Sequence, residues 1–265
     1  MTKRTGAKTN QFQAVEDDFA FFLEHTDEIA REIPLYRESL LALLPPAGAR
    51  MMEYGPGTGS MLKNILSGPG LENLLPRLEA VLAEPSPAFR EQCRLNLSGL
   101  GLKRLEIFPF VADYLETPDA EHSLDLILTN HVFYYVDVFP AEFALLLKAL
   151  KPGGHIVGAL GDPGHPLLKV YEANWDKWGV VKHRRHPSEI LQAFRASGLN
   201  IETRLVSSAL EFPDTPENRL KMHRFLLVES GGFDPESLAW MDDFKRGETI
   251  RFEQLDDFYV LKKSD

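Results

Sequence analysis

The sequence predicts an α/β fold in which a mostly parallel β-sheet carries helices on both faces. Two observations indicate this class. Short apolar segments of strand length alternate with segments of helical periodicity between residues 49 and 160. At least one of the apolar segments, Leu124–Thr129, is nearly unbroken, as strands buried on both faces are. A strand–helix alternation of this kind forms a parallel sheet, because each helix returns the chain to the same end of the sheet.

Strands and helices alternate regularly in this region and less regularly after it. Five strands are expected at Ala49–Tyr54, Leu78–Ala83, Glu106–Ala112, Leu124–Thr129 and His155–Leu160. Helices are expected at Ser60–Ser67, Ala88–Leu97 and Ala141–Leu150, with a Lys-Pro-Gly-Gly stop at residues 151–154. The last third predicts helices at Ser188–Ala196, Pro216–Val228 and Pro235–Phe244 and strands at Ile201–Ser207 and Phe252–Lys262.

The N-terminal segment is helical in pattern. Apolar residues recur three and four apart between Phe12 and Leu44, which predicts two helices separated at Pro34. We therefore expect an N-terminal helical cap over residues 1–48 and a second domain over residues 49–265. Within that domain, residues 213–248 are expected to be a helical insertion that forms part of a substrate pocket.

Composition narrows the class of function. The 265 residues carry a formal net charge of -10, which disfavours binding to nucleic acid and is compatible with a small cationic substrate. The single cysteine, Cys93, excludes an intramolecular disulfide and a multi-cysteine zinc site. The eight histidines show no recognised ligand spacing, so no metal is predicted. A polar N-terminus and the lack of any apolar stretch of membrane-spanning length favour a cytoplasmic protein, either a monomer or a homodimer.

A glycine loop is the strongest motif in the sequence. Gly55, Gly57 and Gly59 follow the first strand and open a helix, which is the context that a ligand-binding loop needs. Their Gly-x-Gly-x-Gly spacing differs from the Gly-x-Gly-x-x-Gly of dinucleotide-binding proteins. Glu84 ends the second strand about 25 residues later. Because that strand end lies at the ligand crevice of a doubly wound sheet, the Glu84 carboxylate could accept both hydroxyl groups of a ribose.

These motifs together resemble class I S-adenosylmethionine-dependent methyltransferases across about residues 49–160. The resemblance implies a Rossmann-like methyltransferase fold with a mostly parallel, seven-stranded sheet, and S-adenosylmethionine as cofactor. It also implies a set of cofactor-binding residues at the ends of the first four strands. These are Glu53, Tyr54, Gly55, Pro56, Gly57, Gly59, Glu84, Pro85, Asp113, Tyr114, Asn130 and His131.

A narrower resemblance concerns the methyl acceptor. Residues 22–28, 84–86, 134–136, 164–178 and 252–258 are similar to histamine N-methyltransferases. That resemblance implies substrate contacts from the helical cap, the end of the fourth strand and the last strand. The corresponding residues are Glu28, His131, Tyr135, Trp175 and Glu253, and the expected catalytic residues are His131, Tyr134 and Tyr135. The two glutamates would suit a substrate that carries positive charge, and His131 could accept a proton from an amine.

The expected activity is therefore transfer of a methyl group to a small molecule, at a nitrogen of a histamine-like or histidine-like imidazole or amine. Other readings stay open. The acceptor could be an oxygen, sulfur or carbon of a secondary-metabolite intermediate. The chain could instead be a nicotinamide-dependent oxidoreductase, or a protein that binds the cofactor without turnover.

Overall fold

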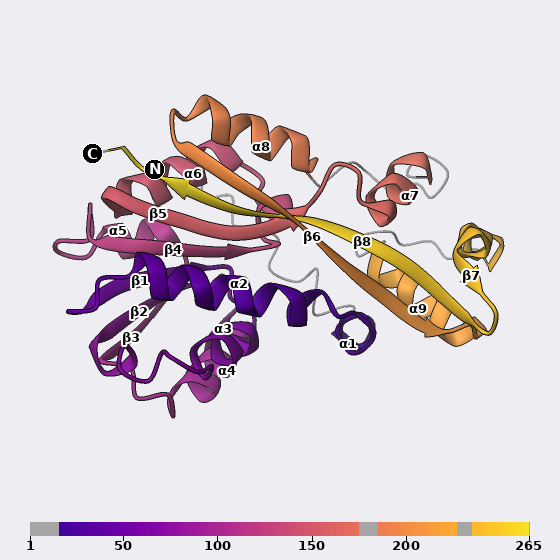
Figure 1. Cartoon of the computed structure of the whole chain (residues 1–265), viewed down its shortest axis with the longest axis horizontal. Coiled ribbons are helices and arrows are strands. Elements are labelled where there is room, and N and C mark those ends of the chain that lie inside the picture. Colours follow the sequence, from indigo (N-terminus) through magenta and orange to yellow (C-terminus); the bar gives the residue numbers. More distant parts are fainter. Residues whose placement is uncertain (1–15, 175–184, 227–234, 265) are drawn as a thin grey trace.

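A computed structural model describes residues 16–174, 185–226 and 235–264 (Figure 1). Within these residues the strands form one sheet in the order β3-β2-β1-β4-β5-β8-β6, with the two-residue β7 paired to β8. The strands are β1 (Ala49–Tyr54), β2 (Leu78–Ala83), β3 (Arg104–Phe108), β4 (Leu124–Asn130), β5 (Leu150–Gly161), β6 (Asn200–Pro213), β7 (Lys245–Arg246) and β8 (Thr249–Lys262). The first five are parallel, and β8 is antiparallel to both β5 and β6. The predicted mostly parallel, seven-stranded sheet is confirmed, with β7 as a short addition.

Helices cover both faces of this sheet. They are α1 (Glu16–His25), α2 (Glu28–Leu43), α3 (Ser60–Leu66), α4 (Pro87–Leu97), α5 (Val111–Leu115), α6 (Phe139–Ala149), α7 (Pro166–Asn174), α8 (Pro187–Ala196) and α9 (Pro216–Leu226), with 3-10 helices η2 (Leu75–Arg77), η3 (Phe133–Tyr135) and η4 (Pro235–Phe244). Apolar side chains of α2, α3 and α4 pack in one cluster, and those of α5, α6 and α8 pack in another. No helix among the described residues is long and apolar enough to cross a membrane.

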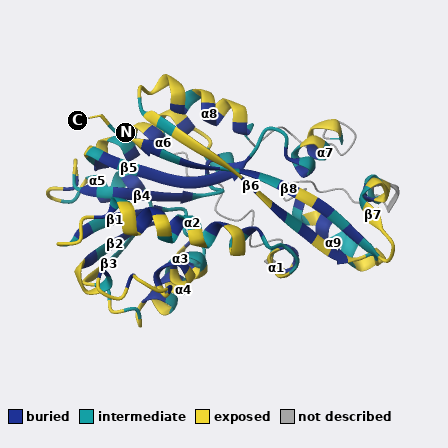
Figure 2. Ribbon diagram, in the orientation of Figure 1, coloured by how far each residue is buried: buried dark blue, intermediate teal, exposed yellow. Residues whose placement is uncertain are grey.

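The central strands are buried on both faces, which explains their unbroken apolar sequences (Figure 2). Successive side chains of a strand point to opposite faces. Met51 accordingly packs with α2, α3 and α4, whereas its neighbour Met52 packs in the cluster of α5, α6 and α8. Each fully buried side chain of this size contributes about 1.5–3 kcal/mol relative to an exposed one. The two faces together hold the sheet as one layer between two layers of helices.

The N-terminal helices are divided at a different place from the one predicted. Pro34 lies inside α2, and the break falls instead at Thr26 and Asp27. There the chain pairs with β6: the Asp27 N–H donates to the carbonyl of Ala209 at 3.0 Å, and the Asp27 carboxylate accepts from the Ala209 N–H at 2.6 Å. These bonds take the backbone out of the helix, whereas Pro34 removes only one helical hydrogen bond.

Strands β6 and β8 form a long antiparallel pair that extends beyond the rest of the sheet (Figure 1). Its far end packs against α1, α9 and η4 in a third apolar cluster, which includes Phe21, Phe212 and Met222. This cluster stands apart from the two clusters of the sheet. It places α1 and α9 beside the cavity described below, because Phe22 and Leu226 belong to the cluster and also line the cavity.

Several predicted strand boundaries differ from the structure: β6 continues to Pro213, six residues beyond its predicted end, and β8 begins at Thr249, three residues before its predicted start. The third strand ends at Phe108, four residues before the predicted end, and Val111 begins α5. Pro109 has no N–H to donate to β2, which accounts for the stop. The fifth strand starts at Leu150 and includes the predicted Lys-Pro-Gly-Gly stop, because Gly153 and Gly154 exchange backbone hydrogen bonds with Lys263. The predicted helix at Pro235–Phe244 is a 3-10 helix.

Gly158 of β5 is a position where the sheet core admits no side chain. A Cβ there would lie closer than 3.0 Å to the carbonyl oxygen of Thr129 and to the hydroxyl of Tyr259. We expect Gly158→Ala to lower the free energy of unfolding by about 2–3 kcal/mol, through overpacking. Urea denaturation followed by circular dichroism measures this. Gly99→Ala is the control, since a Cβ at Gly99 would meet nothing within 4 Å. Equal denaturation midpoints for the two variants would contradict the packing argument.

Candidate active site

A cavity of about 960 Å³ lies at the carboxyl ends of β1, β2, β4 and β5. This is the edge at which open α/β sheets bind ligands. The segments that follow each of these strands line one side of it, and residues of α1, α2, α7, α9 and β8 line the other. Its volume is in the range of small-molecule sites. Of the predicted cofactor residues, those that line the cavity are Glu53, Tyr54, Gly55, Pro56, Gly57, Glu84, Pro85, Asn130 and His131.

Each of the three positions in the loop after β1 requires glycine for a different structural reason. All three have positive φ angles, of 71°, 56° and 75°. A Cβ at Gly55 would clash with Val132, and a Cβ at Gly59 would lie 3.1 Å from the sulfur of Cys93 on α4. Nothing lies within 4 Å of a Cβ placed on Gly57, which lines the cavity. Gly57 is therefore the glycine whose open side a ligand can approach. Gly59 does not line the cavity, and it serves the packing of α4 instead.

Two carboxyl groups lie beside this loop. Glu84 accepts hydrogen bonds from the backbone N–H groups of Gly57 at 3.1 Å and Ser86 at 2.8 Å. Glu53 is 4% exposed, and its Oε2 has no hydrogen-bond partner among the described residues. Burial, and secondarily the charge of Glu84, raise the pKa of Glu53 to about 8. Burial also raises the pKa of Glu84, although its two backbone bonds oppose the rise. This side of the cavity is built for a cationic or hydroxyl-bearing ligand.

The residues predicted after β3 do not reach the cavity. The Tyr114 ring is fully buried, its hydroxyl bonds with Ser123, and the Arg50 guanidinium lies 5.3 Å from its ring centre. Asp113 is on α5 and does not line the cavity, whereas its neighbour Ala112 does. The early end of β3 causes this difference, because the turn into α5 directs the side chains of residues 113 and 114 elsewhere. Neither side chain lines the cavity, and the roles of Asp113 and Tyr114 in cofactor binding stay predictions.

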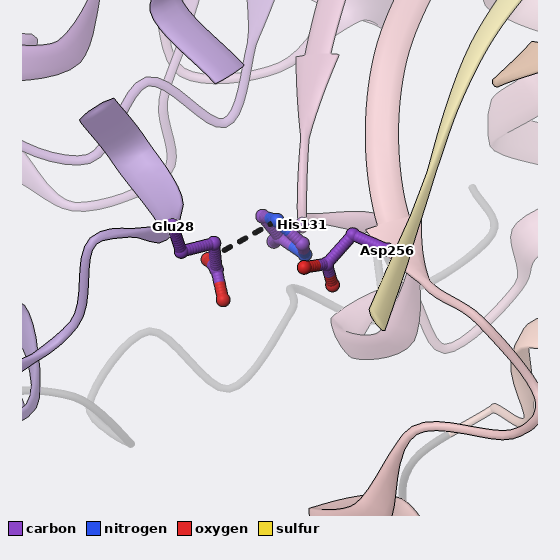
Figure 3. Close-up of side chains that lie close together, drawn as sticks. All are labelled: Glu28, His131 and Asp256. Atoms are coloured by element: carbon purple, nitrogen blue, oxygen red, sulfur yellow. Dashed lines mark ion pairs between the residues drawn. The ribbon is translucent and has the colours of Figure 1, made fainter. Parts of the chain in front are cut away.

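The other side of the cavity carries a group of acidic residues around one imidazole, which we call the anionic end: Glu28, Glu32, His131 and Asp256. Figure 3 shows Glu28, His131 and Asp256 of this group. The His131 Nε2 lies 2.9 Å from Glu32 Oε1 and 3.3 Å from Glu28 Oε1. His131 has a φ of +47°, a conformation that is uncommon outside glycine and is often found at functional sites. Glu28 and Glu32 are one turn apart on α2, so both side chains point the same way.

Electrostatics at the anionic end favour an imidazolium. Burial alone would lower the pKa of His131, but the neighbouring Glu32 and Glu28 carboxylates raise it well above its usual value. Burial raises the pKa of Glu28 to about 8 and that of Asp256 to about 7, while the charge of His131 opposes both shifts. Because a protonated imidazole cannot accept a proton, the expectation that His131 is the proton acceptor does not fit the ligand-free protein.

Strand β8 supplies Gln254 and Asp256 to the cavity, and Glu253 lies on its opposite face. Gln254 donates to Glu28 Oε2 at 3.0 Å and accepts from the Thr26 hydroxyl at 2.6 Å. The Glu253 side chain is 68% exposed and pairs with Arg251 at 2.8 Å. Glu253 does not line the cavity, because neighbouring residues of a strand point to opposite faces, and its contact with substrate stays a prediction.

Aromatic residues after β4 form a wall of the cavity. The Tyr134 hydroxyl accepts a hydrogen bond from the Gly161 N–H, and the Tyr134 ring stacks on His131 with centres 6.3 Å apart. Tyr135 also lines the cavity, with its ring perpendicular to that of Tyr134. Asn130 lines it too, and accepts from the Tyr36 hydroxyl at 3.0 Å. Trp175, another predicted substrate residue, lies outside the described residues.

Sequence reasoning missed four residues of the site: Glu32, His165, Gln254 and Asp256. The i, i+4 spacing of Glu28 and Glu32 was a signal, because it places both on one face of a helix. Polar residues at alternate positions of a strand otherwise rich in apolar side chains were a second signal, for Gln254 and Asp256. No sequence pattern pointed to His165. Burial, and secondarily the charge of His131, lower the pKa of His165 to about 4. Its Nδ1 accepts a hydrogen bond from the Leu167 N–H.

The sheet order and the position of the cavity define a class I methyltransferase fold. The chain belongs to the methyltransferase-domain family, whose model matches residues 25–204. It is thus an S-adenosylmethionine-dependent methyltransferase. No curated protein matches the sequence.

Solved structures share this fold at low sequence identity. A candidate methyltransferase of Bacillus halodurans is 14% identical, with a TM-score of 0.58, over 88% of this chain and 99% of that one. A Thermotoga maritima methyltransferase, named as a possible histamine N-methyltransferase, is 18% identical, with a TM-score of 0.52, over 96% and 99%. Haemonchus contortus phosphoethanolamine N-methyltransferase 2, in complex with phosphomonomethylethanolamine and S-adenosylhomocysteine, is 14% identical, with a TM-score of 0.57, over 100% and 62%.

Glu53 gives a prediction for the pH dependence of stability. Its pKa is higher in the folded protein than its usual value of 4.5, so as pH rises the unfolded chain loses this proton first, and stability falls between about pH 4.5 and 8. Glu53→Gln removes the ionisation and keeps the shape. We expect the ligand-free variant to melt at least about 2 °C above the parent at pH 9 and level with it at pH 4.5. Scanning calorimetry at both pH values measures this, and a difference independent of pH would contradict it.

Proposed function

We propose that the chain transfers a methyl group from S-adenosylmethionine to a nitrogen of a small, positively charged amine or imidazole of the histamine or histidine kind. The supporting observation is the anionic end of the cavity. Its three carboxyl groups outnumber its single imidazole, and a positive charge that enters beside them would favour their ionised forms. Residues 1–48 and the insertion at 213–248 would form the substrate side, since Phe22, Glu28 and Phe225 line the cavity.

The cofactor would occupy the side of the cavity beside the glycine loop. The open face of Gly57 leaves room for a ligand against the backbone. The unpartnered, buried Oε2 of Glu53 suits a cationic or hydrogen-bonding group of the cofactor. Glu84 already accepts two N–H bonds and would accept ribose hydroxyls in the same way. Tyr54, Gly55, Pro56, Pro85 and Asn130 complete this side.

Bound S-adenosylmethionine supplies a methyl group that its sulfonium charge already activates. The acceptor nitrogen needs a free lone pair, which a neutral imidazole nitrogen has, so the positive charge of the substrate would lie on another group of the molecule. The protein therefore has to align this nitrogen with the methyl group, and alignment alone can account for several kcal/mol of the barrier. The Tyr134 ring is fixed by its bond to Gly161, and aromatic faces beside a cation contribute roughly 0.5–2 kcal/mol. Glu28 would hold the positive charge of the substrate, with Gln254 fixing the Glu28 carboxylate.

The related structures support a nitrogen acceptor. The Thermotoga protein is named as a possible histamine N-methyltransferase, and the Haemonchus protein is a phosphoethanolamine N-methyltransferase bound to a methylated amine. The chain spans less than two thirds of the Haemonchus protein, so only that part is comparable. The acidic lining of the present cavity agrees with an amine or imidazole acceptor in chemical terms.

Glu84→Ala tests the assignment of the ribose contact. We expect the affinity for S-adenosylhomocysteine to fall at least about tenfold, because one or two hydrogen bonds to a charged group, worth about 1.5–3 kcal/mol each, are lost. Isothermal calorimetry measures this, with NAD titrated in parallel. Glu91→Ala is the control. Glu91 is exposed on α4, the helix that follows Glu84, and among the described residues it pairs with Arg94. An unchanged affinity in Glu84→Ala would remove Glu84 from the cofactor site.

Glu28→Gln tests the substrate side. With histamine as probe, we expect the KM to rise about tenfold or more while the affinity for S-adenosylhomocysteine stays the same, since Glu28 lies at the anionic end. Methyl transfer from radiolabelled S-adenosylmethionine measures this. Glu24→Gln, an exposed change on the preceding helix, should behave as the parent. An unchanged KM in Glu28→Gln would argue against a substrate cation at this end.

A further inference from the structure

The anionic end brings together three side chains of the types that bind metals. Glu28 comes from α2, His131 from the end of β4 and Asp256 from β8, and each offers a ligand atom within 4.8 Å of the other two (Figure 3). We propose that Glu28, His131 and Asp256 bind one divalent transition-metal ion of the Zn²⁺ type. This inference goes beyond the proposed function, and metal binding here does not depend on it.

The spacing between His131 and Glu28 supports metal ligation. Their nearest atoms, Nε2 and Oε1, are 3.3 Å apart. Hydrogen bonds between oppositely charged N–H and carboxylate groups are shorter, about 2.7–2.9 Å. Two ligand atoms that each lie about 2.0–2.1 Å from a tetrahedral zinc ion are roughly 3.3–3.4 Å apart. The observed separation fits two ligands of one ion and requires little movement of Glu28 or His131. Asp256, whose ligand atom lies within 4.8 Å of the other two, would have to approach them.

Unpartnered oxygens at the same place are a second, independent observation. Asp256 is 1% exposed and Glu32 is fully buried. The Oδ2 of Asp256 and the Oε2 of Glu32 have no hydrogen-bond partner among the described residues. Leaving such an oxygen buried and unpaired costs free energy, which a metal ion would recover. Glu32, whose Oε1 lies 2.9 Å from the imidazole, adds negative charge beside the three ligands.

The donor set selects the kind of ion. Two carboxylates and an imidazole suit zinc and other late first-row ions, whereas Mg²⁺ prefers oxygen ligands and keeps its waters. Three protein ligands leave a fourth position of a tetrahedral ion open, and His131 and Asp256 both line the cavity. A bound ion would thus occupy the place proposed for the positive charge of the substrate, so that, if the proposed function holds, the metal and a cationic substrate exclude each other.

The experiment uses the full chain, stripped with a chelator and titrated with Zn²⁺ in one calorimeter cell and with Mg²⁺ in another. We expect one Zn²⁺ per chain with a dissociation constant in the micromolar range or tighter, and no measurable Mg²⁺ binding. Asp256→Asn and Glu28→Gln, which keep shape and remove charge, should each weaken Zn²⁺ binding at least tenfold. Co²⁺ should give the intense visible bands of a four-coordinate ion in the parent protein and lose them in both variants.

Glu253→Gln is the matched control, because Glu253 lies on the same strand as Asp256 but on its outer face. Its Zn²⁺ affinity should equal that of the parent. Absence of one-to-one Zn²⁺ binding would overturn the proposal, and so would binding that neither Asp256→Asn nor Glu28→Gln weakens. Binding of histamine without binding of Zn²⁺ would show that this end serves organic cations only. That result would leave the proposed function standing and remove the metal site.

Discussion

The contact of His131 with the buried carboxyl groups of Glu28 and Glu32 is the constraint on which the architecture of the cavity depends. Two acidic side chains one turn apart on a buried helix face repel each other unless a cation lies between them. The imidazole at the end of β4 takes that place, 2.9 Å from Glu32 and 3.3 Å from Glu28. It thereby ties α2 to the sheet. The bond from Gln254 to Glu28 ties the same helix to β8, so three distant segments close around one group.

Buried acidity is present at both ends of the cavity. Glu53 beside the glycine loop has a pKa raised to about 8 by burial, and Glu28 at the anionic end is raised to a similar value for the same reason. Groups in such environments destabilise the empty protein as they ionise, and they favour any cation that enters. A methyl donor with a sulfonium group and an acceptor amine are both cations. The reaction that we propose brings a sulfonium donor together with a positively charged substrate, and buried carboxyl groups at both ends of the cavity would suit these two charges.

The fold could be predicted from the sequence much further than the site. Strands β1 and β2 were predicted to the residue, because apolar runs of strand length have few alternatives in an α/β protein. The predicted helix break at Pro34 was wrong. The end of α1 is set by the pairing of Thr26 and Asp27 with β6, a contact across some 180 residues. Glu253 was predicted on the inner face of the last strand, where the structure has its neighbour Gln254 instead. Sequence does not fix the register of a strand against its neighbours. Local spacing places Glu32 beside Glu28 and Asp256 beside Gln254 on one face of each element. That the two faces meet depends on the tertiary contact between α2 and β8, which local spacing does not show.

The origin of these residues in the chain bears on how such enzymes change their acceptor. The loop that holds Gly57, together with Glu53 and Glu84, lies within the first two strand–helix units, where we propose that the cofactor binds. Glu28 and Glu32 precede those units, and Gln254 and Asp256 follow the end of α4 at Leu97 by more than 150 residues. Only His131 bridges the two sets. Because α2 and β8 contact the sheet without contributing to the glycine loop, their polar residues can change while the cofactor side stays intact. A shift of one residue in β8 would replace Gln254 and Asp256 on the inner face by Glu253 and Leu255, or by Leu255 and Asp257. It would thus move the carboxylate and remove the amide without disturbing the side of the cavity beside the glycine loop.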